Sequence, residues 1–214
     1  MRCLFARQIL AAIAGILAWA VASSVALPQD YPARPIRVII PLGPGGGGDV
    51  FTRALADELQ KAWGQPVVVE NRPGGALNIG TRACAEAAPD GCTICVLSSE
   101  PVVYNQLLFK SLPFDPNKDL QPIVNLFIAE IRNGEEYPST WFGLFAPAGT
   151  PPPIIAKLAD EVTRIVSAPD VRQRMFVERG VEPGGARLDD YRRFIREERK
   201  MAAQIVKDSG QQPE

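Results

Sequence analysis

The sequence predicts an α/β fold organised around a parallel sheet, and three observations lead to this fold class. Short runs rich in Ile and Val, which suit strands buried on both faces, recur at residues 36–40, 67–70 and 92–97. Segments with apolar residues three and four positions apart, typical of amphipathic helices, separate these runs. Gly, Pro, Asn and Asp occur in the turns between these segments. Strands that alternate with helices at this spacing form βαβ units with right-handed crossovers.

The first half of the chain alternates regularly. Pro66 opens the second strand, and Pro89-Asp90-Gly91 turns the chain into the third. The expected elements, in order, are a strand at 36–40, a helix from Asp49 to Gly64, a strand at 67–70, a helix at 79–87 and a strand at 92–97.

The second half begins with irregular chain, which three prolines mark. Prolines also stand where the next long helix begins, a position that tolerates them. Its elements, in order, are a strand at 123–129, a polar connection at 130–138, a strand at 141–145, a helix at 154–166 and a final helix capped by Asp189.

Composition restricts the function classes. The 214 residues are 46% hydrophobic and 22% charged, which fits one globular domain or two small ones. The formal net charge is −1 and no block of like charges occurs, so nothing favours binding to nucleic acid or to an anionic membrane surface. We expect no nucleic-acid partner.

The first 26 residues predict export. Arg2 and Arg7 precede the apolar run 9–22, and Ser24-Val25-Ala26 supplies the small residues that a signal peptidase recognises. The apolar run is shorter than the ~20 residues of a membrane-spanning helix. A signal peptide with a mature chain that begins near Leu27 is therefore preferred over a membrane anchor or a buried helix, and it predicts a periplasmic location.

Cysteine and histidine usage argues against catalysis. Cys92 and Cys95 have C-x-x-C spacing, but residues three apart on a strand point to opposite faces, which disfavours a redox pair or a metal site. Cys84, Cys92 and Cys95 are expected to be buried thiols, with one disulfide as the alternative. The chain has no histidine, the commonest general base and metal ligand. We therefore expect no catalytic residue, metal or cofactor.

A glycine loop at 43–48, loop one, follows the first strand. Its pattern G-x-G-x-x-G is that of a dinucleotide-binding turn, and Glu70 ends the next strand about 20 residues later. An export signal and the missing N–H of Pro44 argue against a nicotinamide cofactor. A phosphate-binding P-loop is excluded because no Lys-Ser/Thr follows the glycines. A nucleotide and a small carboxylate both remain as candidate ligands.

Two further loops are expected beside loop one. Loop two (71–78) contains Gly74 and Gly75, and loop three consists of Ser98 and Ser99. The carboxyl ends of neighbouring parallel strands meet at one edge, where ligands bind in open α/β sheets. Backbone N–H groups of the loops and of a helix N-terminus suit an anion. Asp49 either caps the helix or contacts the ligand, and Arg72 is interpreted as structural.

Several motifs in the same order resemble one known family, the substrate-binding proteins of tripartite tricarboxylate transporters, also called the Bug family. The segments that carry the resemblance are YPARPIR (31–37), PLGPGGGGD (41–49), GQPVVVENRPG (64–74), APDG (88–91), LPFDP (112–116) and WFGLFAPAGTP (141–151). They extend over nearly all of the mature chain.

The resemblance implies a monomeric periplasmic receptor with the type II periplasmic-binding-protein fold. In such a receptor two α/β lobes close on a small carboxylate, a di- or tricarboxylate or an amino acid, and deliver it to the membrane components of a transporter. It implies ligand contacts through loop amides and bridging waters. The corresponding positions are Pro44, Gly45, Gly46 and Asp49 in loop one, Gly74 and Gly75 in loop two, and Ser98 and Ser99 in loop three. Ala76-Leu77 departs from the small, glycine-rich segment usual there.

Such receptors have roughly 300 residues, more than is usual for one domain, whereas this chain has 214. The segments of a second lobe are missing between Ala129 and Tyr137. A natural loss and an incorrectly assembled gene would both give this arrangement. The expected organisation is a signal peptide at 1–26, a first α/β lobe at 27–128, a short connection in place of the second lobe at 129–138, and a C-terminal segment that returns to the first lobe at 139–214.

Such a shortened receptor is expected to have lost tight binding, because hinge closure between two lobes buries the ligand. Two alternatives remain at this stage. One is a secreted nucleotide- or NAD-binding enzyme that uses the loop Gly43–Gly48, and the other is a remnant that binds nothing.

Overall fold

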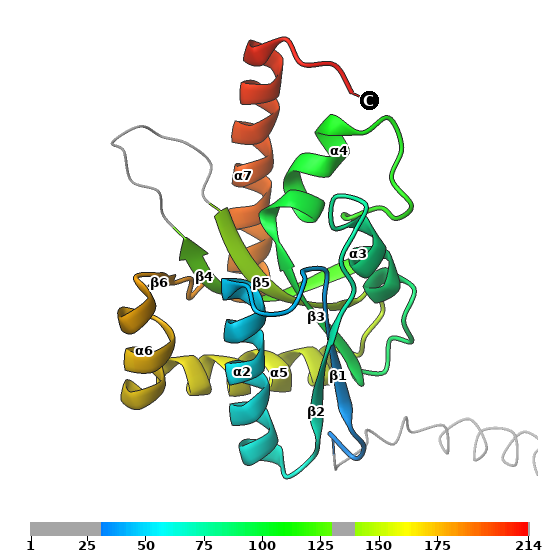
Figure 1. Cartoon of the computed structure of the whole chain (residues 1–214). Coiled ribbons are helices and arrows are strands. Elements are labelled where there is room, and N and C mark those ends of the chain that lie inside the picture. Colours follow the sequence, from blue (N-terminus) through cyan, green and yellow to red (C-terminus); the bar gives the residue numbers. More distant parts are fainter. Residues whose placement is uncertain (1–30, 130–139, 214) are drawn as a thin grey trace, which may run out of the picture. The chain divides into compact units, whose positions relative to one another are not determined.

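A computed structural model describes residues 31–129 and 140–213, and the chain from Pro32 onward forms one compact unit (Figure 1). The expected signal peptide and almost all of the expected connection at 129–138 lie outside the described residues. Within 31–129 and 140–213, no helix is long and apolar enough to cross a membrane.

The core of the unit is a six-stranded sheet with the order β2-β1-β3-β5-β4-β6. β1 pairs in parallel with β2 and β3, whereas β5 runs antiparallel to both of its neighbours, β3 and β4. The sheet is therefore mixed, and its parallel half is the part that the sequence pattern predicted. The strands are β1 Ile36–Ile40, β2 Val67–Asn71, β3 Thr93–Ser98, β4 Leu120–Ala129, β5 Thr140–Pro147 and β6 Glu182–Pro183.

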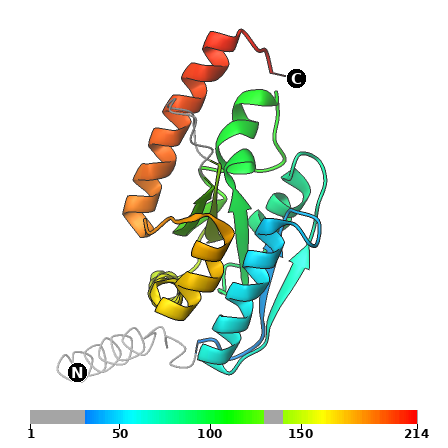
Figure 2. The ribbon, with the colours of Figure 1, turned by 60° about the vertical axis from the view of Figure 1, so that its left-hand side comes forward.

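Helices cover both faces of the sheet (Figures 1 and 2). α2 contacts β2 and α5, and α5 contacts β4 and α6, whereas α3 contacts β1 and β3, and α7 contacts β4 and η1. The first group is α2 Gly47–Trp63, α5 Pro152–Ser167, α6 Pro169–Met175 and η2 Val177–Arg179. The second group is α3 Asn78–Ala85, η1 Glu100–Tyr104, α4 Asn105–Leu108 and α7 Leu188–Ser209.

β4 and β5 pair from one end to the other, from Leu120 opposite Pro147 to Ala129 opposite Thr140. The chain leaves the sheet at Ala129 and re-enters it beside the same residue. Residues 130–139 are too few for a second lobe, because a domain has at least ~50 residues. Residues 130–139 thus connect two paired strands, and the missing second lobe stays a prediction.

The main hydrophobic core lies between the sheet and α7. Tyr191 of α7 packs edge-on against Trp141, with 5.7 Å between ring centroids, and lies 5.6 Å from the ring of Phe145. Gly143 stands between Trp141 and Phe145 on β5, and its missing side chain leaves the space that the Tyr191 ring occupies. On the opposite face, Phe51 of α2 packs against Phe127 of β4 at 4.4 Å.

Most element boundaries differ from the sequence-based expectation by one to three residues, and two of the differences have a local reason. β4 begins at Leu120 and so includes Pro122, which a strand accommodates because the register with β5 shifts between Pro122 and Val124. Asp189 is not the cap of the last helix, because the N-cap is Arg187. Asp189 lies in the first turn, where a carboxylate interacts favourably with the helix dipole.

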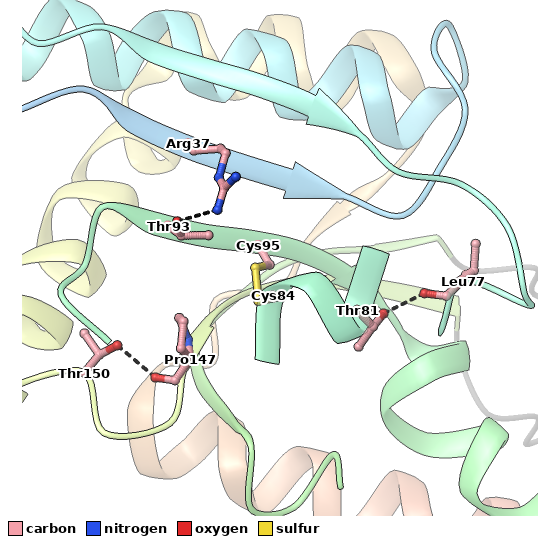
Figure 3. The surroundings of a disulfide bond; sticks show 8 residues. All are labelled: Arg37, Leu77, Thr81, Cys84, Thr93, Cys95, Pro147 and Thr150. Carbon is pink, nitrogen blue, oxygen red and sulfur yellow. Dashed lines mark hydrogen bonds between the residues drawn. A yellow bond between two sulfur atoms is a disulfide. The ribbon is translucent and has the colours of Figure 1, made fainter. Parts of the chain in front are cut away.

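The cysteines also differ from the expectation of buried thiols. Cys84 of α3 and Cys95 of β3 form a disulfide with a Cα–Cα distance of 6.2 Å (Figure 3). Cys92, the other cysteine of the C-x-x-C pair, is free, and its sulfur accepts a hydrogen bond from Arg34 Nε at 2.8 Å. Spacing along one strand argued against a redox pair of Cys92 and Cys95, but it could not show that Cys84 of α3 lies next to Cys95.

Candidate functional site

The loops that follow β1, β2 and β3 lie at the same edge of the sheet. β1 is the central strand of the three and pairs in parallel with the other two, so loop one lies between loop two and loop three. This is the arrangement that the sequence pattern predicted for these loops.

Loop one exposes the N-terminus of α2. The helix begins at Gly47 with Gly46 as N-cap, and its first backbone bond runs from Val50 N to Gly46 O at 3.0 Å. Within the described residues, nothing accepts a hydrogen bond from the N–H groups of Gly47 and Gly48, and Gly46 and Gly47 are exposed. These N–H groups lie at the positive end of the dipole of a 17-residue helix, a position that favours negative charge.

Asp49 holds loop one in place. Its carboxylate is 2% exposed and accepts hydrogen bonds from Gly45 N at 2.8 Å, Asn71 Nδ2 at 2.8 Å and Arg53 Nε at 3.1 Å. Burial acts to raise the pKa of Asp49, but these hydrogen bonds and the charge of Arg53 outweigh it, and the pKa lies below its usual value.

Neither role that the sequence suggested for Asp49 fits these contacts well. Asp49 is the third residue of α2 and not its cap, because Gly46 occupies that position. Its oxygens point to the loop and to Asn71 on β2, and its side chain is almost fully covered. We interpret Asp49 as a positioning residue that ties loop one to loop two.

Loop two has an unusual backbone conformation. Four consecutive residues have positive φ: Gly74 at 115°, Gly75 at 55°, Ala76 at 51° and Leu77 at 70°. Among the described residues, none accepts a hydrogen bond from the N–H groups of Gly75, Ala76 and Leu77, so they too are available to an anion. At Ala76-Leu77 this chain therefore has two ordinary residues in a conformation that favours glycine.

Asn105 holds loop two in this conformation, and the sequence analysis missed it. Its Nδ2 donates to Ala76 O and to Asn78 Oδ1, both at 2.8 Å, from a buried position at the start of α4. Thr81 Oγ1 binds the next carbonyl oxygen, that of Leu77, at 2.8 Å (Figure 3). Asn105 is far from loop two along the chain, and no local motif marks it as a partner.

Replacing Ala76 by glycine is expected to stabilise the protein. Ala76 is exposed and has a φ of 51°, a region that costs an ordinary residue about 1–2 kcal/mol. Part of this gain is offset by the greater entropy of glycine in the unfolded chain, so we expect the free energy of unfolding to rise by about 0.5–1 kcal/mol in urea titrations. The matched control, Ala203→Gly on an exposed position of α7, should lower it by about 1 kcal/mol. A loss of stability in Ala76→Gly would contradict this interpretation.

Loop three is less accessible than the other two loops. Ser98 and Ser99 are 2% and 1% exposed, and Ser98 Oγ is covered and has no hydrogen-bond partner among the described residues. Glu100 follows directly, with one carboxylate oxygen buried and likewise unpartnered. Burial and the nearby carboxylates of Glu198 and Glu100 raise the pKa of Tyr104 to about 12. The acidic environment behind loop three indicates that an anion would be held by loops one and two.

The residues of the dinucleotide pattern are engaged elsewhere. Glu70, at the position that would bind a ribose, accepts from Arg72 Nε at 2.6 Å and from Arg37 Nη1 at 3.5 Å. Arg72 forms an ion pair with Glu70, which agrees with the expectation that Arg72 has a structural role and does not bind the ligand. Among the described residues, no group of three or more His, Cys, Asp or Glu side chains could hold a metal ion.

Comparisons with known proteins give a consistent result. The model of the tripartite tricarboxylate transporter family receptor matches residues 51–133 and 127–211. Protein BugT of Bordetella pertussis is 43% identical over 117 residues, which cover 54% of this chain and 36% of BugT. A UPF0065 protein encoded in the gbd 5′ region of Cupriavidus necator is 35% identical over 146 residues, 68% of this chain and 41% of the relative. This chain spans between 28% and 41% of the lengths of the curated relatives it matches.

Solved structures share the fold. The periplasmic binding protein BugD has a TM-score of 0.77 at 18% identity, with 86% of this chain and 100% of that chain covered. A Rhodopseudomonas palustris protein solved with adipate has a TM-score of 0.79 at 17% identity, with the same coverage. MatC from Rhodopseudomonas palustris, with bound malate, has a TM-score of 0.71 at 20% identity and covers 82% of this chain and 100% of that chain. At these identities the likeness establishes the fold.

Proposed function

The chain belongs to the tripartite tricarboxylate transporter receptor family, and from this premise we propose that it is a periplasmic binding lobe for a small carboxylate. Members of this family are substrate-binding proteins and not enzymes. In this proposal the ligand is delivered to the membrane components of a tripartite transporter, and the chain acts as a monomer exported by its signal peptide.

One observation carries the proposal: loops one and two expose unpaired N–H groups at one edge of the sheet. Gly47 provides one at the exposed N-terminus of α2, beside the unpaired N–H of the buried Gly48, and Gly75, Ala76 and Leu77 provide them in loop two. Asp49 and Asn71 link the two loops, so the two sets of donors are held relative to one another. Such a site suits a carboxylate without requiring a cationic side chain. The relatives that were solved with adipate and malate support a dicarboxylate as the ligand class.

The proposal includes weak binding. The two matches to the family model meet at residues 127–133, where β4 ends, and β4 and β5 pair to their ends. Both observations support the absence of the lobe that would close over the ligand. A carboxylate bound to one lobe keeps much of its hydration, so a dissociation constant near 1 mM, about −4 kcal/mol, is expected in place of a tight complex.

Calorimetry and NMR together test this proposal. Malate, adipate, citrate, glutamate and aspartate should each give no micromolar binding in isothermal titration, but at least one should shift the amide resonances of loops one and two at millimolar concentration. Micromolar affinity for any of them would overturn the expected impairment. Absence of all shifts would favour the remnant that binds nothing, and a rise in melting temperature with NAD would favour a nucleotide-binding protein.

Gly46→Asp separates loss of binding from loss of folding. Gly46 has an extended backbone, and a side chain added there meets nothing within 4 Å. As an N-cap, aspartate accepts hydrogen bonds from the N–H groups that the ligand would use and stabilises the helix. The variant should therefore lose the carboxylate-induced shifts while its melting temperature stays the same or rises. Gln211→Asp, at an exposed site after α7, should keep them.

A further inference from the structure

A pocket of about 410 Å³ lies where α7 and η1 meet β4 and β5, and none of its lining residues belongs to loops one and two. Its lining includes Leu120 at the start of β4 and Phe145 near the end of β5. Phe142 pairs with Ser98 of loop three, whereas Pro147, five residues further along β5, pairs with Leu120. At about 3.3 Å per residue, Leu120 is roughly 16 Å along the sheet from Ser98, and the pocket reaches closest to loop three at Val102, three residues after Ser99. This pocket is therefore separate from the proposed carboxylate site.

The floor of the pocket is apolar and belongs to the hydrophobic core. Val102, Leu120, Phe145 and Ile195 all line it, and all four are buried residues of the main core. They come from η1, β4, β5 and α7, elements that pack together in one compact unit. The pocket thus requires no second lobe for its walls.

Three arginines of α7 line the same pocket, and no acidic residue does. Arg192, Arg196 and Arg199 are four and three positions apart, so they share one face of the helix. Arg199 is fixed: its Nη2 donates to Val102 O at 3.0 Å and its Nη1 donates to Asn117 Oδ1.

The other two guanidinium groups are available to a ligand. Arg192 pairs with Asp189, whose side chain is 92% exposed, and such solvent-exposed pairs are worth little. Arg196 forms no hydrogen bond or ion pair with any residue in the described ranges 31–129 and 140–213. A carboxylate that displaces Asp189 or pairs with Arg196 would gain charge-assisted hydrogen bonds at small cost.

We propose that this pocket binds an organic carboxylate with an apolar body, the class of medium-chain or aromatic acids. The apolar part would lie on the floor formed by Val102, Leu120 and Phe145, and the carboxylate would bind Arg192 and Arg196. The volume is within the range of small-molecule sites, roughly 300–1,000 Å³. The ligand class differs from the dicarboxylates proposed for the loops, because here an apolar surface would hold part of the ligand.

Octanoate is the probe for this proposal, titrated into the mature full-length chain and followed by amide NMR and calorimetry. It should shift resonances of α7 and of the segment before β4. The double variant Arg192→Gln/Arg196→Gln should weaken its affinity at least tenfold. Arg193→Gln is the matched control, since Arg193 lies on the same helix, does not line the pocket and should change the affinity less than twofold.

Two further ligands separate charge recognition from apolar partitioning. Acetate, which lacks the apolar body, and octylamine, which carries the opposite charge, should each bind at least tenfold more weakly than octanoate. Equal binding of octylamine, unchanged affinity in Arg192→Gln/Arg196→Gln, or the absence of octanoate shifts in α7 would each overturn the proposal. Gly46→Asp, which blocks loop one, should leave octanoate binding unchanged, so failure at the loops and failure at this pocket are distinguishable.

Discussion

Gly143→Ala is expected to cause the largest loss of stability of any single methyl group added to this chain. A Cβ at residue 143 would lie 2.5 Å from Cζ of Tyr191 and closer still to its hydroxyl oxygen. Tyr191 is fully buried against Trp141 and Phe145, so its ring has no free space to move into. Either the ring leaves the core or β5 shifts, and we expect the free energy of unfolding to fall by about 3 kcal/mol or more.

Chemical denaturation measures this loss, and a second glycine serves as control. A Cβ at Gly47, the first residue of α2, meets nothing within 4 Å, so Gly47→Ala should change stability by less than about 0.5 kcal/mol. Tyr191→Leu removes the ring atoms that a Cβ at residue 143 would meet. The double variant Gly143→Ala/Tyr191→Leu should therefore lose less stability than the sum of the losses of the two single variants. Strict additivity would show that the clash with Tyr191 is not the cause.

Removing the disulfide is expected to have the second largest effect. Cys84 and Cys95 are 11 residues apart and fully buried, and the bond ties α3 to the centre of the sheet. Closing a loop of this length stabilises the folded state by about 3 kcal/mol relative to the open chain. Cys84→Ala/Cys95→Ala should therefore lose about that amount, and a reductant should lower the stability of the parent chain but not that of the variant.

Cys92→Ala is the matched control for the disulfide. Cys92 is free and partly exposed, so Cys92→Ala should lower the free energy of unfolding by less than about 1 kcal/mol. The reductant should still lower the stability of this variant, because its disulfide is intact. Thiol titration of the unfolded mature chain should find one reactive group, because Cys3 lies in the expected signal peptide. Three reactive thiols in the protein isolated from its own compartment would contradict the disulfide. The bond itself agrees with export, since disulfides persist in oxidising compartments.

Local patterns in the sequence predicted the parts of the fold that depend on local forces. The runs of Ile and Val became β1, β2 and β3, and the helix from the glycine loop to Gly64 became α2. Three strands separated by two helices imply a parallel arrangement, so the sequence also predicted that the three loops meet at one edge. The chain's short length and the residues missing after Ala129 predicted a single lobe, and this stays a prediction beside the observed pairing of β4 with β5.

The sequence by itself therefore determined the family, the order of the main elements and the edge of the sheet where the three loops meet, because periodicity, glycines and motifs are properties of neighbouring residues. Only the tertiary structure decided which distant residues meet. In the folded chain Asp49 accepts hydrogen bonds from Gly45 and Asn71, and Asn105 donates to loop two. Cys84 forms a disulfide with Cys95, and Tyr191 packs over Gly143. The tertiary structure also assembled the arginine-lined pocket from η1, β4, β5 and α7. These contacts depend on strand register and helix packing, which are set by burial across the whole core and leave no local signal in the chain.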